Sequence, residues 1–315
     1  MKKIGITVYA FNVQNNVNQR MELHNIANRV GFIEILQDFM YRHNFDYTRE
    51  DLMEKVFKTN DYTVETINDD DGNEKFTILS GMIKTGDYGI VSEIVNSGTG
   101  QTVYTKSVAD ADVMPFFFSV AVPAGQTDRG IIIFQTLGIY GMKTVFHKKL
   151  EDFIKEIDPA LKLIIGNVMP RAYIEHYLDY GVLQKIRLLK YDIPNDVSER
   201  IGINNGVQTS YQELIIHKPV GFLERKRQLV NECLRGQRFC NSIIEIDNFE
   251  YDNLKLEIQL GKGTKTFNLA NIDNLVVTED ITERVTILGG NPTDNSIKPI
   301  LTETSEQYLG EMGLA

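Results

Sequence analysis

Cysteine is scarce in this chain. Only Cys233 and Cys240 occur among 315 residues, and neither lies in a cluster of cysteines and histidines. Small secreted domains need several disulfides, and structural zinc sites need four closely spaced ligands. We therefore expect neither a disulfide framework nor a structural zinc site, and no other metal site is predicted.

Long hydrophobic runs are also missing. No apolar stretch approaches the length of a membrane-spanning helix, and the first residues, Met1–Gly5, lack the apolar segment of a signal peptide. The chain predicts a cytoplasmic protein with no membrane span.

Positive charge is in the minority. The chain has 33 Lys and Arg against 43 Asp and Glu, a net charge of −10. Proteins with a general affinity for nucleic acid usually carry a basic surface, so this balance argues against one here. A local basic patch on an acidic protein is still compatible with it. Several common catalytic signatures are absent as well: no nucleophile elbow, no His-Glu-x-x-His and no Gly-x-Gly-x-x-Gly after a strand.

The hydrophobic pattern predicts an α+β protein. The strongest strands are Met114–Val122 and Ile131–Phe134, whose apolar residues face both ways, so both faces of a central sheet should be covered. Further strands are expected at Ile4–Val13, throughout 62–135, and at 161–165, 185–189, 243–246, 254–260 and 264–269. Helices are expected at 24–43, after an N-cap at Thr48, and at 142–157, 171–178, 223–234 and 301–312.

These elements predict a mixed, largely antiparallel sheet with helices packed on it, plus a smaller C-terminal α+β part. The stretch Pro194–Ser210 is rich in Asn, Asp, Ser and Gly and has little periodicity. We interpret it as a boundary, which gives an N-terminal domain over 1–200 and a C-terminal domain over 201–315. Asp69–Glu74 resembles a calcium loop only superficially, and a hairpin turn is the better interpretation.

One candidate site follows the central strand Ile131–Phe134. A loop containing Gly138 and Gly141 leads into an amphipathic helix with Lys143 and Thr144 on its first turn. Free backbone N–H groups and the positive end of a helix dipole suit a phosphate. The spacing is not that of a P-loop, so the alternative is that the glycines only form a tight turn.

A second candidate is the pair Arg171 and His176. This Arg-x4-His spacing is similar to that of helical ribonuclease domains in bacterial conflict systems. Such an arginine can hold a phosphate, and such a histidine can move the 2′-hydroxyl proton near neutral pH. The alternative is an ordinary surface helix, because this spacing also arises by chance.

The third candidate is the densest basic region of the chain. It comprises Arg225, Lys226, Arg227, Arg235 and Arg238. These side chains could follow a nucleic-acid backbone. Alternatively, they form a solvated helix face that pairs with acidic surfaces of the same protein.

Four stretches resemble uncharacterised proteins of bacterial phage-defence, or abortive-infection, islands. They are Lys84–Gly89, Pro115–Phe118, Arg129–Gln135 and Gly141–Lys143, and the resemblance covers roughly residues 80–200. It implies a role in limiting phage by sensing or cutting nucleic acid together with another gene product. It transfers no catalytic residue.

The sequence therefore supports two main hypotheses. The first is a cytoplasmic bacterial antiviral-defence protein that engages nucleic acid, with nuclease activity as an option. The second is a non-enzymatic oligomeric sensor or scaffold whose exposed strands and C-terminal helix bind a partner protein or a second copy. A small-molecule enzyme that uses the 138–144 loop for a phosphorylated ligand is a third option. No cofactor is identified by the sequence.

Overall fold

The chain forms two compact units. The computed structural model describes residues 3–26, 30–168, 171–190, 211–234, 243–246, 249–260, 263–269 and 278–314. Unit 1 combines Met1–Asn167 with Val276–Ala315, and unit 2 comprises Val168–Leu275. The sequence of unit 2 is thus inserted within that of unit 1. This division differs from the predicted one, which placed a single domain boundary after residue 200. The aperiodic stretch that suggested a boundary lies between two strands of unit 2 that pair with each other.

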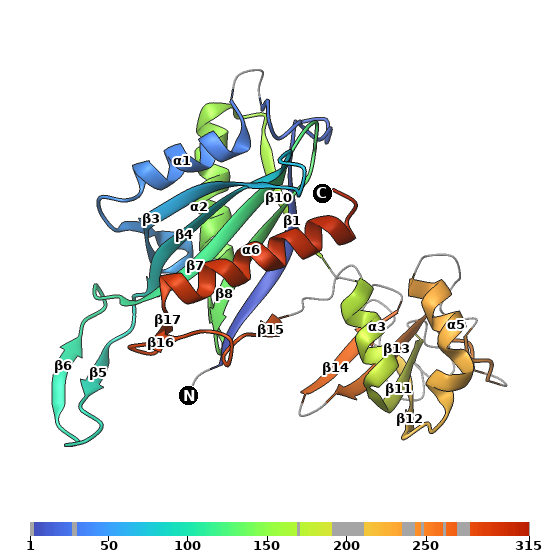
Figure 1. Ribbon diagram of the computed structural model, residues 1–315. Helices are drawn as coiled ribbons and strands as arrows, with labels where there is room; N and C mark the ends of the chain where they lie inside the picture. The colour runs from blue at the N-terminus through green and yellow to red at the C-terminus, as the bar shows by residue number, and fades with distance from the viewer. Residues whose placement is uncertain are drawn as a thin grey trace. The chain divides into compact units, whose positions relative to one another are not determined.

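Unit 1 is built on a nine-stranded sheet (Figure 1). Its main path has the order β10-β1-β8-β7-β4-β3-β2, and β9 and β15 pair with β8 and β1. All neighbouring strands are antiparallel. The strands are β1 (Ile4–Gln14), β2 (Thr48–Glu50), β3 (Lys55–Asn68), β4 (Glu74–Asp87), β7 (Asp112–Pro123), β8 (Gly130–Leu137), β9 (Tyr140–Gly141), β10 (Lys162–Asn167) and β15 (Thr278–Asp280). The α+β class with a large antiparallel sheet is confirmed, and the two strands that are apolar on both faces, β7 and β8, lie in its interior.

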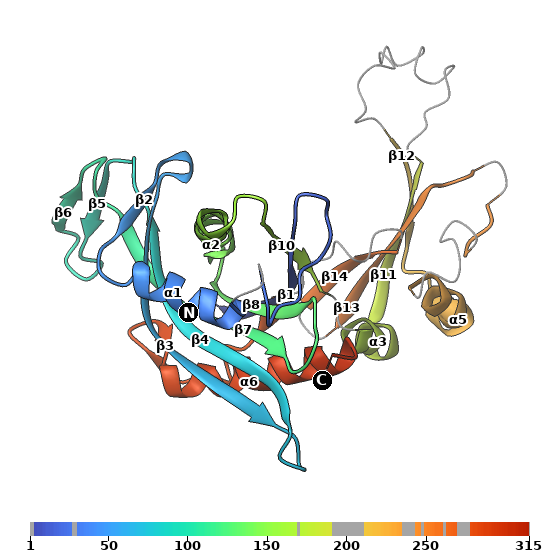
Figure 2. The same ribbon diagram turned by 90° about the horizontal axis from the view of Figure 1, so that it is seen from above.

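Helices cover both faces of this sheet, which explains why β7 and β8 lack a polar side. Helices α1 (Phe32–Arg42) and α2 (Lys143–Ile157) lie on one face, and α6 (Asp294–Glu311) lies on the other (Figure 2). Phe146 of α2 is fully buried, and its ring lies 5.0–5.8 Å from those of Phe39, Phe118 and Phe134. The apolar side of α6 is buried as well, so the predicted use of the C-terminal helix for partner binding would require it to leave its own sheet.

A two-stranded arm interrupts the connection between β4 and β7. Its strands are β5 (Ser92–Val95) and β6 (Thr102–Lys106), and a turn over residues 96–101 joins them. Lys106 is buried at its base, where Nζ donates to the Asp87 carbonyl oxygen at 3.0 Å and to Asp112 at 2.9 Å. Large apolar side chains of the arm are exposed: Ile90, Val91, Ile94, Val95, Val103, Tyr104 and Val108.

Several predicted elements of unit 1 have other bounds or another form. The helix expected after Thr48 is wrong: Thr48–Glu50 is β2, a short 3-10 turn follows (Asp51–Met53), and β3 begins at Lys55. Of the apolar residues that suggested this helix, Val56 and Phe57 are part of β3, and Leu52 lies in the 3-10 turn. Helix α1 begins at Phe32 rather than near His24, and α6 begins seven residues before the predicted Leu301. Strands β16 (Ile287–Leu288) and β17 (Asn291–Pro292) form a small hairpin before α6.

In its described residues, unit 2 has a four-stranded antiparallel sheet and two helices. The sheet order is β12-β11-β13-β14. The elements are α3 (Arg171–Tyr180), β11 (Val182–Lys190), β12 (Gln212–His217), α5 (Phe222–Leu234), β13 (Asn253–Leu260) and β14 (Gly263–Asn268). Ile174 of α3 and Val230 of α5 share one buried cluster with Ile186, Leu254 and Leu256 of the sheet, so both helices pack on the same face.

Unit 2 differs from the sequence-based expectations at residues 243–246 and at Cys233. Residues 243–246, predicted as a strand, form a bend without strand pairing. Cys233 is buried and disulfide-bonded, a single crosslink rather than a framework. Among the described residues of both units, no helix is long and apolar enough to cross a membrane.

His43 makes the stability of unit 1 depend on pH. Its ring packs against Phe39 and Phe57, and its buried Nδ1 has no hydrogen-bond partner in the described structure. Burial, and secondarily the charges of Lys149 and Arg42, lower the pKa of His43 below its ordinary value. The unfolded chain therefore takes up a proton that the folded chain resists, so stability is fully present above about pH 6.5 and falls as the pH drops below it.

We expect His43→Phe to weaken this dependence. Urea midpoints measured at pH 7.5 and pH 5.5 should differ less in the variant than in the original protein, because phenylalanine fits among the same aromatic rings and does not titrate. An equal drop in both proteins would show that other groups control the acid response.

Candidate functional site

The loop with Gly138 and Gly141, predicted as a phosphate site, mainly forms a turn between two strands. Gly138 has a φ of +62°, and with the next residue it forms the two-residue turn between β8 and β9. Its N–H donates to the Lys3 carbonyl oxygen at 2.8 Å, so this group is not available to a ligand. Gly141 is part of β9 and pairs with Thr136. These facts match the alternative that the glycines form a tight turn.

Lys143 and Thr144 do lie on the first turn of α2, which has no acidic residue and no side-chain cap. Thr144 is exposed, and Lys143 places Nζ 3.9 Å from the ring centroid of Tyr9, a cation–π contact. Burial lowers the pKa of Lys143. The described part of the chain gives it no ion pair. A phosphate role for this turn stays a prediction.

Arg171 and His176 both lie on α3, as the sequence predicted, but their side chains are outside the described structure. The neighbouring α3 residues Ile174, Tyr177 and Leu178 are buried in the core of unit 2. The chemistry proposed for this pair therefore stays a prediction. In the described residues no group of three or more His, Cys, Asp and Glu side chains could hold a metal ion.

The basic region separates into residues with and without a carboxylate partner. Arg227 of α5 forms an ion pair with Asp179 of α3, as the solvated-face alternative predicted. Arg235 and Arg238 lie outside the described residues. Arg225 is exposed and Lys226 is partly exposed at the start of α5, and neither has an ion pair or side-chain hydrogen bond in the described parts of the chain.

Two cations on the sheet of unit 2, Arg187 and Lys185, have carboxylate partners. Arg187 binds Glu213 through two hydrogen bonds of 2.6 and 3.0 Å, and Lys185 lies 3.0 Å from Glu257. The bidentate contact raises the pKa of Arg187 and lowers that of Glu213. Arg225 and Lys226, which have no such partner in the described residues, are therefore more available to an outside anion than Arg187 and Lys185.

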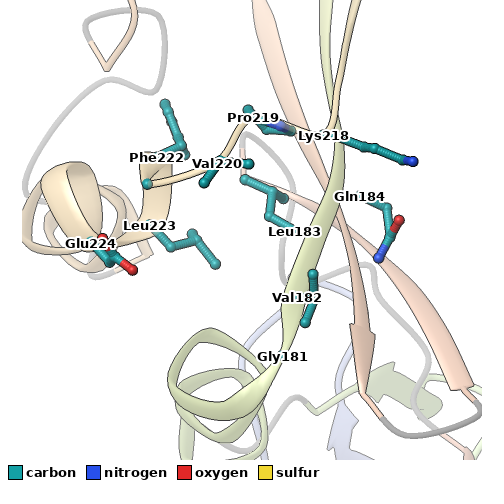
Figure 3. A pocket seen from close by; sticks show the side chains of 11 residues that line it. Gly181, Val182, Leu183, Gln184, Lys218, Pro219, Val220, Phe222, Leu223 and Glu224 are labelled. Carbon is teal, nitrogen blue, oxygen red and sulfur yellow. The ribbon is translucent and has the colours of Figure 1, made fainter.

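A groove with a volume of about 560 Å³ is lined by residues that directly precede Arg225 in the chain (Figure 3). It runs between the start of β11 and the segment that leads into α5. Its lining is mostly apolar and comprises Gly181, Val182, Leu183, Gln184, Lys218, Pro219, Val220, Gly221, Phe222, Leu223 and Glu224. Val220 is 96% exposed and Val182 is 64% exposed, so the apolar wall is open to a ligand.

The loop that forms one wall has an unusual backbone. Lys218 has a φ of +48°, which side-chain-bearing residues seldom adopt, and Gly221 has a φ of +75°. The Lys218 N–H donates to the Gln184 carbonyl oxygen at 2.8 Å, which ties the loop to β11. Figure 3 shows the Lys218 side chain extending past β11 to the side of Gln184 and the Glu224 side chain on α5, with Leu183, Val220 and Leu223 between them.

Charge is distributed unequally between the units. Residues 168–275 contain 14 of the 33 Lys and Arg and 14 of the 43 Asp and Glu, so unit 2 has no net charge. The whole excess of acid belongs to unit 1, with 19 basic and 29 acidic residues. The acidic unit 1 would repel a polyanion, whereas unit 2 as a whole would not.

Sequence reasoning identified Arg225 and Lys226 but missed the groove. Its two walls come from segments about 35 residues apart, which only the pairing of β11 with β12 brings together. One signal was available: Lys218-Pro219-Val220-Gly221 places an apolar residue in a turn before a helix, where a polar one is more usual.

Gly181 lines the groove, and we expect Gly181→Ala to destabilise unit 2. A Cβ there would lie 2.3 Å from Ile258 Cγ2 and 2.4 Å from the Tyr177 carbonyl oxygen, too close for either to remain in place. Overpacking of this kind costs about 1–3 kcal/mol. Hydrogen exchange of the β11 and β13 amides in the full chain measures it.

Gly166→Ala is the matched control, because a Cβ at Gly166 of β10 would meet nothing within 4 Å. Equal protection of unit 2 in Gly181→Ala and in this control would contradict the tight packing described above.

No family model and no curated protein matches the chain.

Proposed function

We propose that this protein binds single-stranded nucleic acid through unit 2. Phosphates would contact Lys218, Arg225 and Lys226, and an unstacked base would enter the apolar groove. The supporting observation is that Lys218 lines a groove of about 560 Å³, and that Arg225 and Lys226 directly follow its last lining residue, Glu224. None of the three has a carboxylate partner in the described structure, and the unit has no net charge. Pockets of this size commonly take small organic groups.

The groove favours a single strand over a duplex. Bases of a single strand can leave the stack and contact apolar or aromatic side chains, whereas those of a duplex are covered by their neighbours. The groove supplies Leu183, Val220 and Leu223 for that contact. Glu224 at the groove end can accept hydrogen bonds from amino groups on a base edge.

A binding titration tests the proposal. A labelled twelve-nucleotide RNA, the equivalent DNA strand and a duplex are titrated by fluorescence anisotropy at several salt concentrations. Three phosphate contacts on a single strand predict a log–log salt slope of about −2. Tighter binding to the single strands is expected, and equal or better binding of the duplex would contradict the role of the groove.

A role in bacterial antiviral defence, in the cytoplasm, is proposed on the resemblance of residues 80–200 to phage-defence island proteins. It predicts that expression of the intact gene with its genomic neighbours lowers phage plating, and that variants of the unit 2 cations lose this effect. Unchanged phage plating with the intact genes would contradict the defence role.

The second candidate function is a non-enzymatic oligomeric scaffold that binds a partner protein or a second copy. The observation that favours it is the open backbone edge of β3 in unit 1. The exposed apolar side chains of the arm add to it, since contiguous apolar surface often marks a contact with another protein.

A further inference from the structure

The outer edge of β3 is unpaired along most of its length. β2 pairs only with Lys55–Phe57, whereas β4 pairs with β3 as far as Asn68. Among the described residues, no strand lies against the outer side of Tyr62–Ile67. Figure 2 shows β3 on the outside of its hairpin with β4. Half of the backbone N–H and C=O groups of this stretch therefore lack a partner strand.

This edge has none of the usual features that prevent strand addition. Tyr62–Ile67 reads Tyr-Thr-Val-Glu-Thr-Ile, with no proline, no lysine and a single charge. The two irregularities in its pairing with β4 lie outside the stretch, before Tyr62 and after Ile67. Five of the six residues are β-branched or aromatic, which are the types that strands favour. Natural edge strands are usually protected by Lys, Pro or bulges, and this one is not.

We propose that β3 pairs antiparallel with β3 of a second copy of this chain, across a twofold axis near Val64. This inference deepens the second candidate function and is independent of nucleic-acid binding. In that arrangement Val64 faces Val64 of the other copy, and Thr63 faces Glu65. No like charges are brought opposite each other along the open stretch.

Charge complementarity at the ends of the strand favours a second copy over an unrelated strand. Lys58 precedes Val64 by six residues, and Asp70 follows it by six, at the tip of the β3–β4 turn. An antiparallel twofold pairing therefore brings the acidic tip of each copy to the Lys58 end of the other. Asp70 and Asp71 are exposed and have no side-chain partner in the described structure, so both can take part. The pairing supplies this contact twice.

The test measures the mass of the full chain by sedimentation over a concentration series. We expect a dimer by about 100 μM, a weak association typical of small interfaces. Val64→Lys places two ammonium groups opposite each other and should give a monomer. Val91→Lys is the matched control, because Val91 is an exposed valine on the arm, and it should leave the dimer intact.

A charge exchange tests the register. Lys58→Glu should weaken the dimer about tenfold, because two attractive contacts become repulsive. Adding Asp70→Lys should restore the dissociation constant of the dimer to within about threefold of its original value. A chain that stays monomeric, a Val64→Lys variant that stays dimeric, a monomeric Val91→Lys variant or a double variant without recovery would each overturn the proposal.

The same samples separate this inference from nucleic-acid binding. Val64→Lys lies in unit 1 and should bind single-stranded RNA as the original protein does. That result also shows that unit 2 is intact in the variant. If the original protein dimerises but binds no nucleic acid, the unit 2 proposal fails while the β3 pairing stands.

Discussion

Replacing Arg225 and Lys226 together by Glu is expected to weaken binding of a single-stranded RNA by at least about a hundredfold at 50 mM salt. Each lost contact to a phosphate is a charge-assisted interaction worth about 1.5–3 kcal/mol, and the introduced carboxylates repel the same phosphates. Neither cation supports the fold through an ion pair in the described structure, so unit 2 should stay folded. Fluorescence anisotropy titration measures the loss.

The control must change the charge of the protein equally at another place. Lys84→Glu with Lys162→Glu also lowers the net charge by four, and both residues belong to unit 1 without an ion pair in the described parts of the chain. This double variant should bind RNA within about threefold of the original, because it removes none of the proposed phosphate contacts. A similar loss in both double variants would mean that net charge, and not the start of α5, governs binding.

Phe146→Ala is expected to lower the free energy of unfolding of unit 1 by about 3–5 kcal/mol. The ring is fully buried, and it connects α2 to Phe39 of α1 and to the central strands through Phe118 and Phe134. Its removal leaves a cavity where three neighbouring aromatic rings lose contacts at once. Urea unfolding measures the change in the free energy of unfolding, and hydrogen exchange of the β7 and β8 amides locates it.

Phe45→Ala provides the comparison for this substitution. Phe45 is 64% exposed, so its removal should cost less than about 1 kcal/mol. A cost for Phe146→Ala as small as that for Phe45→Ala would contradict the position of Phe146 at the centre of the core.

The parts of the fold that the sequence predicted are those with strong hydrophobic patterns. Strands β7 and β8 are apolar on both faces, and the structure covers both faces with helices. Helix α2 has an apolar stripe at helical spacing and begins within one residue of the predicted start. In these cases, the local hydrophobic pattern matches the burial of the residues in the fold.

The errors arise where local signals and long-range pairing disagree. Thr48 was a reasonable N-cap, but Val56 and Phe57 pair with β4 and β2 as part of β3, so strand pairing prevails over the local preference. The inserted position of unit 2 could not be foreseen, because β15 and α6 return to unit 1 only through contacts far along the chain.

The candidate site was predictable only in part. Charge density alone pointed to Arg225 and Lys226, but it could not show that Arg227 is paired with Asp179 on another helix. The glycines at 138 and 141 suggested an anion site, yet the N–H of Gly138 is used by the Lys3 carbonyl oxygen. Partners distant in sequence decide which of these groups a ligand can reach.

Photochemical crosslinking tests most directly where RNA contacts this protein. A single-stranded RNA carrying 4-thiouridine is bound to the full chain, irradiated and digested, and the crosslinked peptides are identified by mass spectrometry. The proposed binding mode predicts crosslinks within 182–184 and 218–226, on the two sides of the groove, and their loss when Arg225 and Lys226 are replaced by Glu. Crosslinks confined to unit 1, or an unchanged pattern in that variant, would contradict it.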